Sequence, residues 1–203
     1  MKINVPENWS EITLSQFQNY HHEVSKDIND ATKLIQTIAT LCNFKFEDAC
    51  KMKIKDVKKI SNYLAELLEQ VPETFVNKFE HKGKIYGFIP KLDEISIGEY
   101  ADLEHYLQNP KQIWNNMHWV MSILYREVEI DNNEIYTIKD YEPSQERADD
   151  FKELSMNVVY SASNFFLTLG VELLEITGNS TQELKEIRNV LKQKIETSGD
   201  GSE

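Results

Sequence analysis

The stretch that decides the fold class is residues 75–90, which read Phe-Val-Asn-Lys-Phe-Glu-His-Lys-Gly-Lys-Ile-Tyr-Gly-Phe-Ile-Pro. Apolar and polar side chains alternate on both sides of residues 81–84, and alternation is typical of strands because successive strand residues point to opposite faces. Gly83 supplies the positive φ that a tight turn needs, so the stretch predicts a β-hairpin. A lone hairpin is only marginally stable in water, and this one must therefore pack on helices.

The chain before this hairpin is predicted to be helical. Thr13 precedes an apolar pattern that begins at Leu14, and Gln16 completes a capping box, which together predict a helix to about Ser25. Three further helical segments are expected where apolar residues recur every three to four positions: from Asn29 or Asp30 to Cys42, from Phe46 to Met52, and from Lys55 to Glu69. Residues 1–70 are therefore expected to form an N-terminal helical subdomain.

The chain after the hairpin mixes helical and alternating patterns. Ser96 and Glu99 form a second capping box that predicts a helix through Leu107, and Pro110 suits the start of a helix over residues 111–125. Residues 126–141 alternate around an acidic turn, and this segment is expected either as a second hairpin or as a loop.

The longest helical pattern runs from Ala148 to Ile176 and is apolar around most of its circumference, which predicts the central helix of the core. Gly178 is expected to end it, a charged helix to follow to about Glu196, and residues 197–203 to be a disordered acidic tail. The sequence thus predicts an α+β protein that is mainly α, with one hairpin or two packed on a long central helix. Residues 71–196 form the second subdomain in this interpretation and share one core.

Composition limits the classes of function. The 203 residues include 22 Lys and Arg against 34 Asp and Glu, a formal net charge of -12. This charge repels nucleic acid and anionic lipid, so neither partner is expected. Residues 1–10 lack the apolar core of a secretory signal, no stretch reads as a membrane-spanning helix, and two cysteines do not make a disulfide framework. A cytosolic location is therefore expected.

One segment departs from the acidic balance. Residues 45–59 contain six lysines and three acidic residues. A nucleic-acid site needs arginines or aromatic side chains among its basic residues, and this segment has no arginine and only Phe44 and Phe46 nearby. A solvated helix face or a docking patch for an acidic partner is the favoured interpretation.

Candidate chemical groups do not assemble into a catalytic or metal site. Glu99, Asp102 and His105 recur at every third position of one predicted helix, but the other helices supply no second carboxylate-x-x-His set, so a polar outer face is favoured over a metal site. His118 has no carboxylate within a turn of its own helix and is expected to be an interior or boundary histidine. No phosphate-binding loop and no nucleophile paired with a base are present, which predicts a protein that is not an enzyme and has no cofactor.

Surfaces for a protein partner remain. Large aromatic and apolar side chains of the kind that centre protein interfaces are the candidates for partner contact, although such residues in a small helical domain are more often core. They are Trp9, Phe17, Phe88, Ile89, Trp114 and Trp119.

Four stretches carry a resemblance to a known class of proteins. They are the pattern Trp9-x-x-Ile12-Thr13-Leu14-x-x-Phe17, the run from Gly83 to Leu103, Trp119 to Arg126, and Ser161 to Phe166. Over residues 9–170 the chain resembles small proteins from the structural gene blocks of tailed bacteriophages, namely tail assembly chaperones or minor head and tail components.

The resemblance implies a function in binding. A tail assembly chaperone binds phage tail or neck proteins in the host cytoplasm during assembly and carries no catalytic residue. One alternative is a connector that stays in the virion, and homo-oligomerisation is open. A second alternative, an enzyme with an unrecognised site, would be sought around Glu99, His105 and His118.

Overall fold

The computed structural model describes residues 3–70, 72, 74–91, 94–132 and 135–164. Within these ranges helices predominate beside one small antiparallel sheet, so the protein is of the α+β class and mainly α, as the sequence predicts. None of the described helices is both long and apolar enough to cross a membrane. The predicted helix to Glu196 and the acidic tail lie outside the described residues.

The N-terminal part contains the predicted helices and begins with a 3-10 turn, η1. The bounds are Trp9–Glu11 (η1), Leu14–Val24 (α1), Asp30–Leu41 (α2), Phe46–Ala49 (α3) and Ile54–Glu69 (α4). Thr13 caps α1 as expected, because the Gln16 backbone N–H donates to Thr13 Oγ1 at 3.2 Å and the Thr13 N–H donates to Gln16 Oε1 at 2.8 Å. This reciprocal cap satisfies backbone donors that have no partner within the helix.

The predicted hairpin is formed by β1 (Lys78–His81) and β2 (Lys84–Phe88), which pair antiparallel. Lys82 and Gly83 connect the strands with φ values of 49° and 75°. Two successive positive φ values are the signature of a type I′ turn, whose twist matches that of the flanking strands. Gly83 adopts this conformation without the steric cost that a Cβ atom would add.

Residues 126–141 form a second hairpin and not a loop. Its strands are β3 (Tyr125–Asp131) and β4 (Tyr136–Ile138), and the sheet order is β1-β2-β3-β4 with every pair antiparallel. The two hairpins join through β2 and β3, which place Gly87 directly opposite Arg126.

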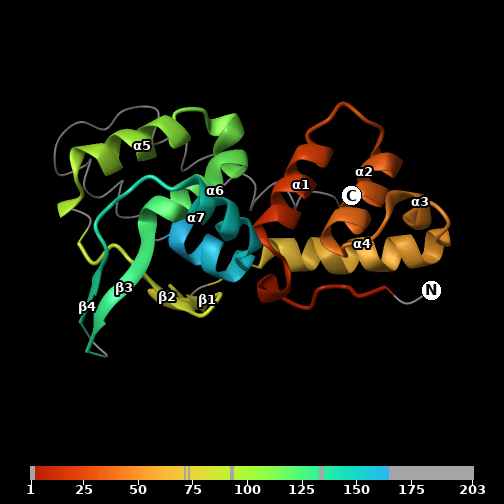
Figure 1. The fold of residues 1–203 in the computed structure, drawn as a ribbon. Coiled ribbons are helices and arrows are strands. Elements are labelled where there is room, and N and C mark those ends of the chain that lie inside the picture. Colours follow the sequence, from red (N-terminus) through yellow and green to blue (C-terminus); the bar gives the residue numbers. More distant parts are fainter. Residues whose placement is uncertain (1–2, 71, 73, 92–93, 133–134, 165–203) are drawn as a thin grey trace.

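The helices between the two hairpins are α5 (Ile97–Leu107) and α6 (Ile113–Leu124), with a 3-10 turn, η3, at Pro110–Gln112. Nine of the twelve residues of α6 are buried, so α6 is the central helix of the described core. It contacts α1 of the N-terminal part and runs directly into β3. Figure 1 shows α1 to α4 at one end of the molecule and the sheet at the other.

The prediction of one continuous helix from Ala148 to Ile176 is wrong. The chain forms a short helix α7 (Gln145–Asp150) and a 3-10 turn η4 (Phe151–Glu153), and it becomes helical again over residues 156–164. Between these helices the backbone pairs with the start of the chain: the Leu14 N–H donates to the Leu154 carbonyl, and the Met156 N–H donates to the Ile12 carbonyl, both at 2.8 Å. These bonds replace helical ones, which explains the break. The remainder, residues 165–176, lies outside the described residues.

Buried side chains from both predicted subdomains belong to one hydrophobic cluster. Ile38 and Leu64 come from the N-terminal helices, Phe88 and Tyr125 from the sheet, and Met121 from α6. Helix α1 and strand β3 both pack on α6, and the core is continuous from the N-terminal helices to the sheet.

Candidate functional site

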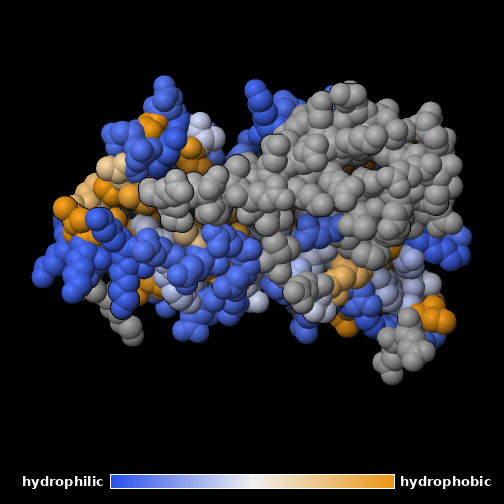
Figure 2. All heavy atoms as spheres, turned by 180° about the vertical axis from the view of Figure 1, so that it is seen from behind, coloured by the Kyte–Doolittle hydropathy of each residue, from blue (hydrophilic) through white to orange (hydrophobic). Residues whose placement is uncertain are grey.

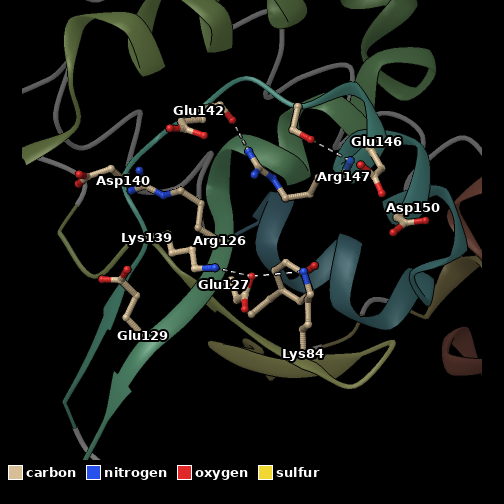
Figure 3. Close-up of a pocket in the computed structure, with 12 residues that line it drawn as sticks. Lys84, Arg126, Glu127, Glu129, Lys139, Asp140, Glu142, Glu146, Arg147 and Asp150 are labelled. Atoms are coloured by element: carbon tan, nitrogen blue, oxygen red, sulfur yellow. Dashed lines mark hydrogen bonds and ion pairs between the residues drawn. The ribbon is translucent and has the colours of Figure 1, made fainter.

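A charged pocket of about 400 Å³ lies between the sheet and α7 (Figure 3). Its lining combines four basic side chains with six acidic ones. They are Lys84, Arg126, Lys139 and Arg147, and Glu127, Glu129, Asp140, Glu142, Glu146 and Asp150. The chain has three arginines in all, and two of them line this pocket. We refer to it as the two-arginine pocket.

Arg126 enters the pocket from β3 and is only 9% exposed. Its Nη1 lies 3.0 Å from Oε1 of Glu99, a carboxylate on α5 that is itself 4% exposed. The other oxygen of Glu99 accepts the Ser96 backbone N–H at 2.7 Å, so the helix cap fixes the carboxylate that faces the arginine. Arg126 Nε is buried and has no hydrogen-bond partner within the described part of the chain. Arg126 is therefore largely enclosed by the protein, with Glu99 as its counter-ion.

Arg147 enters the pocket from α7 and is half-buried. Two backbone carbonyls hold its guanidinium: Nη2 donates to Glu142 O at 2.7 Å, and Nε donates to Ser122 O at 3.2 Å. Burial lowers the pKa of Arg147, and the positive charge of Arg126 lowers it further. Arginine stays protonated despite such shifts, so the pocket holds two cations that repel each other.

The lysines of the pocket are paired with one glutamate. Glu127 lies 2.9 Å from Lys139 Nζ and 3.4 Å from Lys84 Nζ (Figure 3). The hydrogen bond from Lys139 is the main reason that the pKa of Glu127 is lowered. Lys84 and Lys139 therefore share one counter-ion, whereas Arg147 forms no ion pair with another described side chain.

The three side chains on α5 that were considered as metal ligands do not come together. Glu99 is buried in its pair with Arg126, which contradicts the polar outer face expected for it. Asp102 accepts a hydrogen bond from Tyr141 Oη at 2.5 Å, while His105 is exposed. Among the described residues no group of three or more acidic, histidine or cysteine side chains is placed to hold a metal ion.

His118 occupies the interior position that the sequence predicts. It is 8% exposed, and its Nδ1 lies 3.1 Å from Gln18 Nε2. Burial lowers the pKa of His118 to about 4, because the charged imidazolium loses its hydration. The side chain is therefore neutral near pH 7 and serves as a hydrogen-bonding core residue.

The aromatic residues proposed for partner contact are mostly core residues. Five of the six are at most 5% exposed and pack into the hydrophobic cluster: Trp9, Phe17, Phe88, Ile89 and Trp114. Trp119 is half-buried and stacks on Tyr106, with ring centroids 5.2 Å apart. Burial among other rings explains why these side chains are unavailable at the surface in this structure.

Other side chains are exposed instead. The largest exposed apolar fractions belong to Ile97 at 84%, Ile54 at 77% and Ile135 at 75%. On the face seen in Figure 2 hydrophobic side chains form small separate patches among hydrophilic ones. The six lysines of residues 45–59 are all exposed, as a solvated helix face requires.

Sequence reasoning did not single out either arginine of the pocket. The rarity of arginine was the available signal: it makes up three of the 22 basic residues, and two of the three lie in β3 and α7. Comparison with models of protein families, with curated protein sequences and with solved structures found no match.

Proposed function

We propose that this protein is a non-enzymatic binding protein that engages phage tail or neck proteins during assembly, in the manner of a tail assembly chaperone, and that the two-arginine pocket contacts the partner. The observation that supports a binding function is the presence of two guanidinium groups held in fixed positions in one pocket. Glu99 holds Arg126, and two backbone carbonyls hold Arg147. Arginines fixed in this way recognise carboxylate groups with directional hydrogen bonds.

The residue types of the pocket support binding over catalysis. Its lining contains no histidine or cysteine, and Ser144 Oγ is engaged by the Arg147 backbone N–H at the start of α7. A nucleophile within reach of a general base is the usual requirement for covalent catalysis, and the described lining offers none.

The phage assignment is supported by the residues that carry the resemblance. Two of the four stretches contain parts of this site. The run from Gly83 to Leu103 includes β2 and Glu99, and the segment from Trp119 to Arg126 ends at Arg126 itself. The same two stretches pair as β2 and β3 and supply the buried ion pair behind the pocket. The resemblance and the pocket therefore involve the same part of the molecule.

A connector that stays in the virion is the second candidate. It is favoured by two exposed side chains on α5, Ile97 at 84% and Tyr100 at 53%. A connector would bury such apolar surface in a permanent contact with its neighbours, whereas a chaperone would leave it in contact with water after releasing its partner. A connector forms a ring with fixed copy number, whereas a chaperone leaves before the particle is complete.

The proposal is tested by mass spectrometry of purified phage particles together with a pull-down from infected host lysate. The baits are the wild type, Arg147→Gln and the matched control Lys26→Gln, which removes an exposed charge in the N-terminal part. We expect the protein to be absent from particles, and a tail or neck protein to be retained by the wild type and the control but lost with Arg147→Gln.

Three results would contradict parts of the proposal. A fixed ring-like copy number in the particle would replace the chaperone with the connector. Equal recovery of the partner by Arg147→Gln would exclude the pocket as the contact site. Recovery of no phage protein by any bait would leave an enzymatic role to be examined.

A further inference from the structure

The charges of the two-arginine pocket lie in two zones. The cations Arg126 and Arg147 are buried and half-buried, respectively, whereas four carboxylates of the lining are exposed. These are Glu129, Asp140, Glu142 and Glu146. Figure 3 shows that Glu129 and Asp140 lie on the side of β3 and β4, and that Glu146 lies on the side of α7. The exposed carboxylates therefore lie on both sides of the two arginines.

Of the two arginines, Arg147 has no counter-ion in the part of the chain that the structure describes. It forms no ion pair with another described side chain, and its two hydrogen bonds use only Nε and Nη2 of a group with five N–H donors. Arg126 is paired with Glu99 and adds a second positive charge nearby. A half-buried cation without a counter-ion gains most from a carboxylate that also accepts hydrogen bonds. The pocket is therefore built to receive an acceptor with negative charge.

The exposed carboxylates determine which charges a ligand can place next to that acceptor. The four exposed carboxylates make no ion pair within the described ranges, while Lys84 and Lys139 are both occupied by Glu127. A run of acidic residues or a nucleic acid would bring further negative charge against these carboxylates and against a chain with a net charge of -12. Basic side chains on either side of one carboxylate would be attracted.

We propose that the two-arginine pocket binds a peptide segment in which a single carboxylate lies between basic side chains. The carboxylate accepts hydrogen bonds from Arg147, close to the positive charge of Arg126, and the flanking basic side chains pair with Glu129, Asp140 and Glu146. This inference rests on the proposed function, because it names the class of segment that the partner protein would present.

Titration of the full-length protein with short probe peptides, followed by NMR, tests this chemistry. The first probe is acetyl-Ala-Lys-Glu-Lys-Ala-amide, the second carries Gln in place of Glu, and the third carries Ala in place of both Lys. We expect the first probe to bind at least tenfold more tightly than either of the others, and its affinity to fall as NaCl is added because the contacts are ionic.

Variants connect the binding to the pocket. Arg147→Gln is expected to weaken binding of the first probe at least tenfold, and Lys26→Gln to leave it unchanged. The double variant Glu129→Gln with Glu146→Gln is expected to remove most of the preference for the lysine-containing probe over the lysine-free one. Unchanged thermal unfolding of each variant shows that it is folded.

Two results would overturn the inference. One is binding of inorganic phosphate or of an all-acidic pentapeptide as tightly as the first probe, since a plain anion site does not need the exposed carboxylates. The other is binding of the first probe that Arg147→Gln does not alter. If the probes fail while the pull-down still depends on Arg147, the segment chemistry is wrong and the proposed function stands. If the probes bind as expected while no phage protein is recovered, the pocket chemistry stands and the phage assignment falls.

Discussion

The buried pair of Glu99 and Arg126 gives the sharpest prediction for stability. Their side chains are 5% and 10% exposed, and Nη1 lies 3.0 Å from Oε1. Replacing Glu99 by Gln removes the negative charge and leaves the arginine charge buried without its counter-ion. Removing one partner of such a pair typically costs about 3–5 kcal/mol, far more than breaking an exposed pair.

The choice of Gln separates the ion pair from the helix cap. The Ser96 backbone N–H donates to Glu99 Oε2 at 2.7 Å, and an amide oxygen in the same place still accepts that bond. The capping contribution of about 1 kcal/mol is thereby retained. We therefore expect the free energy of unfolding to fall by about 3 kcal/mol, which a domain of ordinary stability survives.

Urea unfolding followed by circular dichroism measures the change. With a slope of about 2 kcal/mol per molar urea, the midpoint of the Glu99→Gln variant falls by about 1.5 M at an unchanged slope. Adding Arg126→Met to this variant should restore part of the loss, because the unpaired charge is then gone. The matched control Asp48→Asn, which breaks the exposed pair with Lys51, should move the midpoint much less. A loss below about 0.5 M in Glu99→Gln would refute the argument from burial.

Three further predictions follow from single side chains. Between pH 6.5 and pH 4 the histidine at position 118 is protonated in the unfolded state but stays neutral in the folded state, where it is buried. As the pH falls through this range, the free energy of unfolding should therefore drop by up to about 3 kcal/mol relative to the His118→Gln variant, as measured by urea unfolding. Gly87→Ala should destabilise by about 1–3 kcal/mol in the same assay, because the added Cβ would clash with the Tyr136 ring that lies over it. In the native protein a thiol reagent should react only with Cys50, which is exposed. Cys42 is buried, which raises its pKa to about 11, and should react only after unfolding; absorbance of the released reagent counts the reacted thiols in each state.

Local patterns in the sequence were sufficient for most of the helices and for the first hairpin, whereas the second hairpin was one of two alternatives. The capping residues Thr13 and Ser96 mark the starts of α1 and α5, and Gly83 lies in the turn where its φ of 75° is needed. Each of these features depends on contacts within a few residues, which periodicity and capping rules describe directly.

The break at Leu154 shows where such reasoning stops. Residues 148–164 have a helical apolar pattern, and nothing local in them requires an interruption. The interruption comes from backbone hydrogen bonds to Ile12 and Leu14, which lie some 140 residues earlier in the chain. Because a partner so distant in sequence leaves no trace in a local pattern, the break becomes visible only when the two segments are placed side by side.

The candidate site was missed for a related reason. A sequence pattern identifies candidates by residue type and spacing. On that basis the tryptophans and the three polar residues of α5, Glu99, Asp102 and His105, were candidates, and the arginines were not. Burial reverses this order, since Trp9 and Trp114 are packed inside, and Arg126 and Arg147 gain importance because water no longer screens them. A lysine at position 147 would keep the charge but could not donate to the Ser122 and Glu142 carbonyls through a planar fork while presenting a further N–H to a ligand. The binding role that we propose for this pocket therefore depends on the hydrogen-bonding geometry of arginine as well as on its charge.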